Sequence, residues 1–335
     1  MPETLLEIRD LHVSFRTENG LVRAVDGLSL TVENDDVVGI VGESGSGKTV
    51  SMMAVMRLIR DPNAIITGQV LLRGRDLMAL PQSEMRAVRG AEIAMIFQDP
   101  MTALTPVYTV GWQIAEQLRA HRRMTKLEAK RRSIELLAEV GIPNPERRVD
   151  EYPHEFSGGM RQRVMIAMAL SCNPSLLIAD EPTTALDVTI QAQILELMKR
   201  LRRDHGSSIL IITHDMGVVS DLAERVVVMY AGGVVEEGPK QAVFREPQHP
   251  YTWGLLDSIP RVGLTRGRRL TVIPGQPPSL LAPPTGCRFA PRCLYRFPKC
   301  DERPELVAKV GPDHLDACFL DPAMRRDLRQ ERRTA

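Results

Sequence analysis

The chain contains 335 residues and has a formal net charge of +1, with 43% hydrophobic and 25% charged residues. This composition is typical of a globular protein with a sizeable core, and the length fits one large domain or two modest ones. The balanced charge gives no indication of nucleic-acid binding. No apolar run approaches the ~18 residues that a membrane-spanning helix needs, and residues 1–7 lack the basic and apolar regions of a signal peptide. We therefore expect a protein of the cytoplasm whose membrane role would depend on a partner.

The first 41 residues predict β-structure. Apolar and polar residues alternate between residues 5 and 35, which is the pattern of half-buried strands. Asn19-Gly20 interrupts this alternation and is a strong hairpin signal. The β-branched run at 37–41 is typical of a buried strand.

The octapeptide after that run carries the most specific pattern. It reads Gly42-Glu43-Ser44-Gly45-Ser46-Gly47-Lys48-Thr49 and matches G-x-x-x-x-G-K-[ST] at every fixed position. In this pattern glycines let backbone N–H groups approach a polyphosphate, the lysine supplies a charge, and the Thr49 hydroxyl can ligate Mg²⁺. A helix expected at 49–56 would direct its N-terminus toward the phosphates. Because a strand precedes and a helix follows, a site for a nucleoside triphosphate is favoured over a chance glycine-rich turn.

The remaining pattern indicates an α/β fold. Residues 112–141 are helix-rich and end at Pro143 and Pro145. Strands are predicted at 175–180, 208–213 and 225–230, with helices at 187–203 and 215–224 between them. Alternating strands and helices predict a mostly parallel sheet covered on both faces.

Two acidic residues end the strand predicted at 175–180. An aspartate at this place, Asp180, can hold Mg²⁺ beside a phosphate loop, and the adjacent Glu181 can orient or deprotonate an attacking water. Acids that merely cap a strand are the alternative, and the phosphate loop upstream favours the catalytic interpretation.

Ser157, Gly158 and Gly159 precede another apolar helical run. A serine there is a natural N-cap, and two glycines let backbone N–H groups approach an anion, although an ordinary helix can begin in the same way. The cluster resembles the signature motif of the ATP-binding subunits of ABC transporters. Phe156 and Met160 flank it where leucine and glutamine are commoner in that family.

Other motifs of the same family follow in the expected order. The resemblance implies that Gln98 senses Mg²⁺ and water and borders a membrane partner, and that Ala185-Leu186-Asp187 forms the D-loop. It also implies that His214 contacts the γ-phosphate and that Phe15 stacks on adenine. A lone histidine is more often structural and a strand phenylalanine more often core, but His214 directly follows an apolar strand.

The resemblance implies a P-loop ABC ATPase fold. Such a fold has a RecA-like, mostly parallel core, an N-terminal antiparallel β subdomain and a helical signature subdomain. We expect a nucleotide-binding domain at 1–245, with its helical subdomain at about 99–160, and a C-terminal extension at 246–335. In this family the signature of one subunit closes on ATP held by another, so a dimer is implied, usually with a homologous ATPase subunit. The implied roles are general base for Glu181, charge stabilisation for Lys48 and His214, and Mg²⁺ binding for Thr49, Gln98 and Asp180.

The extension narrows the resemblance to the oligopeptide/dipeptide importers. The residues concerned are His249-Pro250-Tyr251-Thr252, Pro274-Gly275 and a group of cysteines. This branch implies an ATPase subunit that docks on two membrane permease subunits at the cytoplasmic face of the inner membrane and is served by an extracytoplasmic binding protein. Peptides are the expected cargo, with nickel chelates or glutathione as alternatives. A soluble ABC ATPase of DNA repair or translation is the competing class, but such proteins usually carry two ATPase domains or a long insertion.

Four of the five cysteines lie in the extension, at Cys287, Cys293, Cys300 and Cys318. In a proline-rich segment of a cytoplasmic protein they favour a metal site over disulfides. No C-x-x-C pair is present, which weakens the zinc interpretation. We expect the interleaved cations to lower the thiol pKa values; these are Arg288, Arg292, Arg296 and Lys299. The resemblance favours a [4Fe–4S] cluster, with Zn²⁺ and free thiols as alternatives, and Cys172 is expected to be a core thiol.

Overall fold

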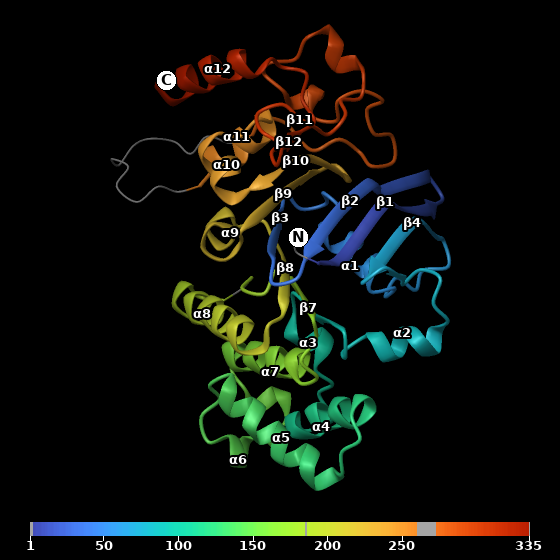
Figure 1. Ribbon diagram of the computed structural model, residues 1–335, viewed down its shortest axis with the longest axis vertical. Coiled ribbons are helices and arrows are strands. Elements are labelled where there is room, and N and C mark those ends of the chain that lie inside the picture. The colour runs from blue at the N-terminus through green and yellow to red at the C-terminus, as the bar shows by residue number, and fades with distance from the viewer. Residues whose placement is uncertain (1–2, 185, 260–272, 335) are drawn as a thin grey trace. The chain divides into compact units, whose positions relative to one another are not determined.

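The computed structural model describes residues 3–184, 186–259 and 273–334 (Figure 1). The chain forms two compact units, each assembled from separate segments. One comprises Met1–Leu6, Thr31–Val37 and Leu71–Ile212 and is called the signature unit; the other comprises Glu7–Leu30, Val38–Val70 and Thr213–Ala335 and is called the phosphate-loop unit.

The phosphate-loop unit contains strands of two sheets. β2 (Gly20–Glu33), β1 (Thr4–Thr17) and β4 (Ala64–Leu72) are neighbours in that order, and the hydroxyl of Thr17 donates to the carbonyl of Gly20 at the predicted hairpin. In the other sheet β3 (Val37–Val41) runs parallel to β9 (Arg225–Tyr230), and β10 (Gly233–Pro239) runs antiparallel to β9. β12 (Leu315–Asp316) then pairs with β10, and β11 (Val307–Ala308) pairs with β12.

The helices of this unit have between 6 and 13 residues. They are α1 (Lys48–Val55), α9 (Met216–Leu222), α10 (Lys240–Arg245), α11 (Pro250–Asp257) and α12 (Pro322–Thr334), with 3₁₀ turns η2 (Ala290–Arg292) and η3 (Pro298–Asp301). A Cβ atom on Gly39 of β3 would lie 2.8 Å from Cγ1 of Val219, so glycine permits α9 to pack closely on the strand.

The signature unit is built on three parallel strands, β6 (Ile93–Ile96), β7 (Leu176–Asp180) and β8 (Ser208–Thr213). A short strand, β5 (Arg75–Asp76), pairs with the end of β4. Its helices are α2 (Gln82–Val88), α3 (Pro100–Ala103), α4 (Val110–His121), α5 (Lys126–Glu139), α6 (Pro145–Arg148), α7 (Gly158–Leu170) and α8 (Val188–His205), with a 3₁₀ turn η1 (Pro153–Glu155). Figure 1 shows α4 and α5 beside α7, and each of the three contacts the other two.

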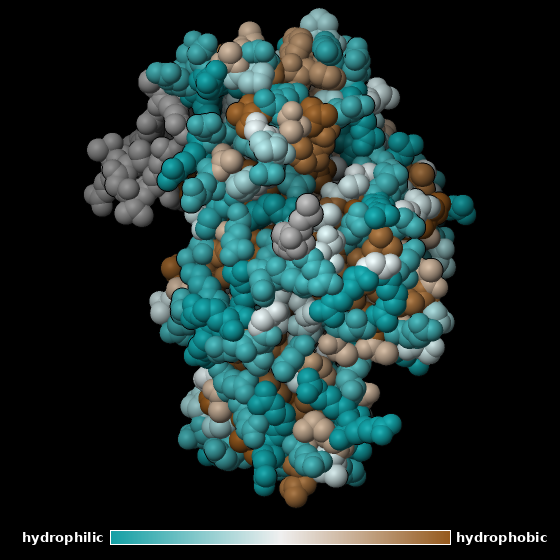
Figure 2. Space-filling model, viewed as in Figure 1, coloured by the Kyte–Doolittle hydropathy of each residue, from teal (hydrophilic) through white to brown (hydrophobic). Residues whose placement is uncertain are grey.

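The core follows from the apolar runs in the sequence. Every residue of β3, β6, β7 and β8 is buried, as parallel strands with both faces covered require. On the face shown in Figure 2 hydrophilic residues predominate, with hydrophobic residues in small separate groups. None of the described helices is both long and apolar enough to cross a membrane.

The predicted strands at 175–180, 208–213 and 225–230 are confirmed by β7, β8 and β9. The helix predicted at 187–203 is α8, and the helix-rich stretch is α4 and α5. The domain boundary near residue 245 stays a prediction.

Candidate functional site

The predicted phosphate loop joins β3 to α1 and curls around its own lysine. Lys48 is only 5% exposed. Its Nζ donates to the carbonyl oxygens of Gly42 at 2.7 Å and Glu43 at 2.9 Å, and to Oγ of Ser46 at 3.2 Å. Ser44, Gly45 and Thr49 are exposed. The charge is therefore already placed inside the loop, while the outer residues face solvent.

Two of the loop's glycines are required by close backbone approaches. A Cβ on Gly42 would lie 2.2 Å from the carbonyl oxygen of Met229, and one on Gly47 would lie 2.4 Å from that of Ala24. Gly47 also has a φ of 97°, in the left-handed region. The fixed glycines of the motif thus match the steric demands of this loop.

Phe15 and His214 also belong to the phosphate-loop unit. Phe15 lies on β1 and is half-buried, so part of its ring stays accessible. His214 is exposed at the end of β8. Asp215 follows it and caps α9, because its Oδ1 accepts from the N–H of Gly217 at 2.7 Å.

The acidic pair lies in the signature unit. Asp180 ends β7 and is 3% exposed. Oε2 of Glu181 accepts hydrogen bonds from Nε2 of Gln98 at 3.0 Å and Oγ1 of Thr184 at 2.8 Å. The structure therefore brings Gln98 and Glu181 into direct contact. Sequence reasoning missed Thr184, whose position three residues after Glu181 in one loop is the signal that could have identified it.

The backbone of Glu181 is strained. Its φ is 46°, a left-handed value that costs a non-glycine residue about 1–3 kcal/mol and is commonest at functional sites. Its N–H donates to the carbonyl of Ile212 at 2.8 Å, which holds the strained residue in place.

The predicted signature cluster begins α7. Oγ of Ser157 accepts from the N–H of Met160 at 3.4 Å, which confirms the N-cap. Ser157 and Gly158 are exposed. Nε2 of Gln162, one helical turn on and 2% exposed, donates to the carbonyl of Pro182 at 2.6 Å and ties α7 to the loop that carries Glu181. Sequence reasoning did not predict this contact.

Asp187 is exposed and caps α8, accepting from the N–H of Ile190 at 3.0 Å. Ala185, the first residue of the predicted D-loop, lies outside the described residues. Gln98, Ser157–Gly159, Asp180, Glu181 and Asp187 thus belong to the signature unit, and the phosphate loop, Phe15 and His214 to the phosphate-loop unit.

The prediction of an iron–sulfur cluster is wrong. The four predicted ligands, Cys287, Cys293, Cys300 and Cys318, do line one cavity, but its volume is only about 10 Å³. This is about the room of one water molecule, too small for four irons and four sulfides. Among the described residues no group of three or more His, Cys, Asp or Glu side chains is arranged to hold a metal ion, so Zn²⁺ is not supported either.

The expected effect of the neighbouring cations is also wrong. Burial raises the pKa of the Cys287 thiol, that of Cys293 to about 11 and that of Cys318 to about 12. The cations are directed elsewhere, with Arg288 paired to Asp26, Arg292 to Glu43 and Arg296 to Asp301, and Lys299 over the ring of Phe319. Near neutral pH the thiols of Cys287, Cys293 and Cys318 are therefore protonated. Cys172 is 5% exposed, as expected of a core thiol.

We expect Cys293 to alkylate slowly near neutral pH, because only the thiolate reacts and its pKa is about 11. The rate should rise about tenfold per pH unit between about pH 8 and 10, where an ordinary thiol of pKa about 8.5 levels off. Iodoacetamide labelling followed by peptide mass spectrometry measures this, with Ser279→Cys as the exposed control. Equal rates for the two thiols near neutral pH would contradict the expectation.

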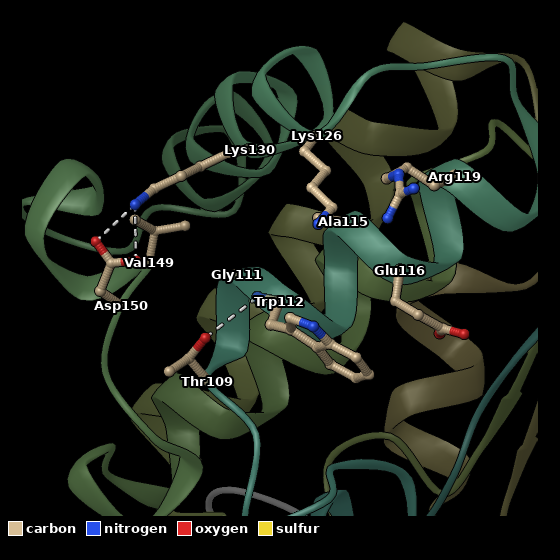
Figure 3. Close-up of a pocket in the computed structure, with 10 residues that line it drawn as sticks. All are labelled: Thr109, Gly111, Trp112, Ala115, Glu116, Arg119, Lys126, Lys130, Val149 and Asp150. Atoms are coloured by element: carbon tan, nitrogen blue, oxygen red, sulfur yellow. Dashed lines mark hydrogen bonds and ion pairs between the residues drawn. The ribbon is translucent and has the colours of Figure 1, made fainter.

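A cavity of about 300 Å³ lies in the signature unit among α4, α5 and the end of α6 (Figure 3). Trp112 lines it and is 49% exposed. Its ring stacks on that of Tyr108 with centroids 4.1 Å apart. Figure 3 shows Lys130 bonded to Asp150 across the cavity from Trp112 and Arg119.

Two family models match the chain. One, described as ABC transporter, matches residues 25–184, and the other, described as oligopeptide/dipeptide transporter, C-terminal region, matches residues 235–300.

Curated relatives match nearly the whole chain. The oligopeptide transport ATP-binding protein OppD of Bacillus subtilis (strain 168) is 54% identical over 94% of this chain and 88% of its own length. The dipeptide transport ATP-binding protein DppD of the same organism is 53% identical over 95% of each chain, and OppD of Salmonella typhimurium (strain LT2) is 49% identical over 94% of this chain and 93% of its own. These names describe ATP-binding proteins and none of them mentions iron–sulfur chemistry.

Solved structures of ABC cassettes share the fold. A dimeric, post-hydrolysis structure of the cassette MJ0796 with ADP and Pi has a TM-score of 0.63 and 27% identity, covering 70% of this chain and 99% of its own. CbiO1 from Clostridium perfringens has a TM-score of 0.61 and 26% identity, covering 73% of this chain and 92% of its own. The predicted fold class and resemblance are confirmed: the chain belongs to the ATP-binding subunits of the oligopeptide/dipeptide branch of ABC transporters.

Proposed function

We propose that this chain hydrolyses ATP to drive the import of peptides across the cytoplasmic membrane as a subunit of an ABC transporter. The observation that carries the proposal is the match to peptide-transport ATP-binding proteins along both the cassette and the C-terminal region. The local geometry agrees with it, since Lys48 is enclosed by its loop and Glu181 is held by Gln98.

The proposed roles of the site residues are those that the resemblance to ABC transporter subunits implies, and the chemistry of the side chains agrees with them. Gly42–Thr49 binds the ATP phosphates through backbone N–H groups and Lys48. Glu181 is the general base for the attacking water, and His214 stabilises charge at the γ-phosphate. Phe15 stacks on adenine. Thr49, Gln98 and Asp180 supply the oxygen ligands that Mg²⁺ prefers, and the bound ion neutralises phosphate charge.

A second ATPase subunit completes the site in this proposal, and a homologous chain is the expected partner. Support comes from the cassette MJ0796, whose solved structure is described as dimeric. Ser157, Gly158 and Asp187 are exposed, so a partner subunit can contact them. Outside its own helix and chain neighbours, no described atom lies within 4 Å of a Cβ built on Gly158. We propose that the partner's ATP approaches this space.

Gly158→Ala is therefore expected to leave the melting temperature unchanged and to lower ATP hydrolysis by the dimer about tenfold, because the methyl group occupies space meant for phosphate. Gly159→Ala is the matched comparison. Its Cβ would lie 2.8 Å from Cγ2 of Ile190, so it should destabilise the chain itself. Thermal melts and ATPase assays separate the two effects. Wild-type ATPase activity in Gly158→Ala would contradict the proposed composite site.

The membrane permeases are proposed to dock on the stacked aromatic pair formed by Tyr108, which precedes α4, and Trp112, which lies on α4. Val107, Tyr108 and Trp112 are 70%, 45% and 49% exposed and follow Gln98 closely in the sequence. Large exposed apolar residues next to a cavity are typical of a protein interface. We propose that a cytoplasmic helix of a permease subunit enters the cavity of Figure 3, with two permease subunits in the complex.

Trp112→Ala is expected to weaken assembly with the permeases by about 2 kcal/mol or more, as removal of a buried aromatic anchor does at other interfaces. ATP binding by the isolated chain should not change. Co-purification with tagged permeases measures the first quantity, with Leu294→Ala as control because Leu294 is 71% exposed in the extension. Undiminished assembly of Trp112→Ala would exclude this docking site.

Reconstitution tests the function as a whole. The chain, its permeases, the partner ATPase and an extracytoplasmic binding protein in vesicles should accumulate labelled dipeptides and oligopeptides only when ATP is present on the cytoplasmic side. Uptake of a nickel chelate or glutathione in place of peptides would support the importer assignment but change the assigned cargo. ATPase activity without transport of any of these would reject the importer assignment.

A further inference from the structure

The C-terminal extension contacts the phosphate loop at Glu43. This is the second residue of the loop and one of its variable positions. Its carboxylate accepts hydrogen bonds from Nη1 of Arg292 at 2.6 Å and from Nη2 at 3.1 Å. Its backbone N–H donates to the hydroxyl of Tyr251 at 2.8 Å. Both the side chain and the main chain of Glu43 are therefore held by residues more than 200 positions away.

Arg292 is built into the protein as a fixed anchor. Its side chain is 4% exposed, and Nε donates to the carbonyl of Pro274 at 2.8 Å while Nη1 donates to the hydroxyl of Tyr230 at 3.3 Å. Burial alone would lower the pKa of this guanidinium, but the hydrogen bonds to Glu43 and Tyr230 outweigh it and the pKa is raised. The guanidinium of Arg292 is thus always charged and is held in one orientation.

An aromatic cluster supports the second contact. The centroid of the Tyr251 ring lies 4.6 Å from the centroid of the Tyr230 ring and 5.5 Å from that of the Phe289 ring. Tyr251 is fully buried, and burial raises the pKa of its hydroxyl, which therefore stays neutral. Its oxygen is held as an acceptor for the Glu43 N–H.

Arg288 extends the same connection to the middle of the loop. It donates to the carbonyl of Ala231 and to the carboxylate of Asp26. The N–H of Gly232, the next residue, donates to the carbonyl of Ser46 at 3.0 Å. Arg288 and Arg292 belong to one short segment between Cys287 and Cys293, so this segment contacts the phosphate loop directly at Glu43 and indirectly, through Ala231 and Gly232, at Ser46.

We propose that Arg292 is a positioning residue for ATP. By pairing with Glu43 it holds the phosphate loop in the conformation that binds ATP. It also neutralises the charge of a carboxylate that would otherwise repel the triphosphate. This inference rests on the proposed role of Gly42–Thr49 in ATP binding. It gives the C-terminal extension a direct part in nucleotide affinity.

The physical reason is twofold. A carboxylate within the loop repels an approaching polyanion unless a fixed cation neutralises it. The carbonyl of Glu43 also accepts a hydrogen bond from Nζ of Lys48, so a shift of Glu43 would displace the lysine that the phosphates need. Loss of Arg292 therefore affects both charge and geometry at one site.

Titration of the full-length chain with a fluorescent ATP analogue and Mg²⁺ tests the proposal. Arg292→Gln is expected to raise the dissociation constant about tenfold. Glu43→Gln in the same chain should recover most of the affinity, because a neutral pair replaces the uncompensated carboxylate. Arg292→Lys should recover part of it, since a lysine restores the charge but not the two-point contact. Arg296→Gln, which breaks the exposed pair with Asp301, is the matched control and should bind like wild type.

The melting temperature of each variant separates positioning from folding. A purely structural role would lower the melting temperature of Arg292→Gln and leave the affinity of the folded fraction unchanged, which would overturn the proposal. So would an Arg292→Gln affinity that Glu43→Gln does not improve. Lys48→Ala is measured alongside. If that variant also bound ATP normally, the phosphate-loop assignment itself would fail, whereas loss of binding in Lys48→Ala alone would reject only the role of Arg292.

Discussion

Replacing Glu181 with glutamine is expected to lower the rate of ATP hydrolysis by about 10²- to 10⁴-fold, the usual contribution of a positioned general base, while ATP binding is retained. Glutamine keeps the size of the side chain and can still accept the hydrogen bonds from Gln98 and Thr184 through its carbonyl oxygen. It cannot take a proton from water at neutral pH. The loss should therefore appear in kcat and not in affinity for ATP.

Glu181 is held in a defined position beside Gln98. Its left-handed backbone, with φ of 46°, and the bond from its N–H to Ile212 direct this one side chain toward Gln98. Single-turnover hydrolysis and equilibrium ATP binding are the two measurements needed. Glu196→Gln is the matched control, since that carboxylate is 68% exposed and lies 4.0 Å from the ammonium of Lys199. If Glu181→Gln hydrolysed ATP within a few-fold of the wild-type rate, Glu181 would not be the general base. ATP-dependent peptide uptake by this variant would contradict the proposal that hydrolysis through Glu181 drives transport.

Features that depend on neighbouring residues could be predicted from the sequence. The phosphate loop is one, because the bonds from Lys48 to Gly42, Glu43 and Ser46 all lie within the octapeptide. The N-cap of α7 is another, since Ser157 and Met160 are one helical turn apart. Continuous apolar runs in the sequence likewise predicted the buried parallel strands.

Long-range contacts between loops could not be predicted in this way. Arg292 stands next to Cys293 in the sequence and was therefore expected to act on thiols, yet its charge is directed at Glu43, 249 positions away. The cysteines do meet at one cavity, as their grouping indicated, but burial raises the pKa of Cys293, against the expectation from its cationic neighbours in the sequence. No local periodicity encodes where a proline-rich segment folds back, so partners of this kind become visible only in three dimensions.

Replacing Lys48 with alanine is expected to weaken ATP binding by about 10²-fold or more, equivalent to roughly 2.7 kcal/mol. Charge-assisted hydrogen bonds to phosphate are among the strongest that a protein makes, and this ammonium is almost completely buried within the loop before ATP arrives. Alanine would also take away the donor that three oxygen atoms of the loop share, on Gly42, Glu43 and Ser46. The variant should therefore lose both the charge and the shape of the site.

The two losses can be measured separately. Lys48→Met keeps the length of the side chain without its charge. A smaller fall in melting temperature for Lys48→Met than for Lys48→Ala would measure the contribution of side-chain packing to stability. Both variants should bind ATP equally poorly. Lys199→Ala is the matched control, because it removes an ammonium of α8 that lies outside the phosphate loop. Binding by Lys48→Ala at wild-type strength would show that the backbone N–H groups of the loop suffice, and the enclosed lysine would then need another explanation.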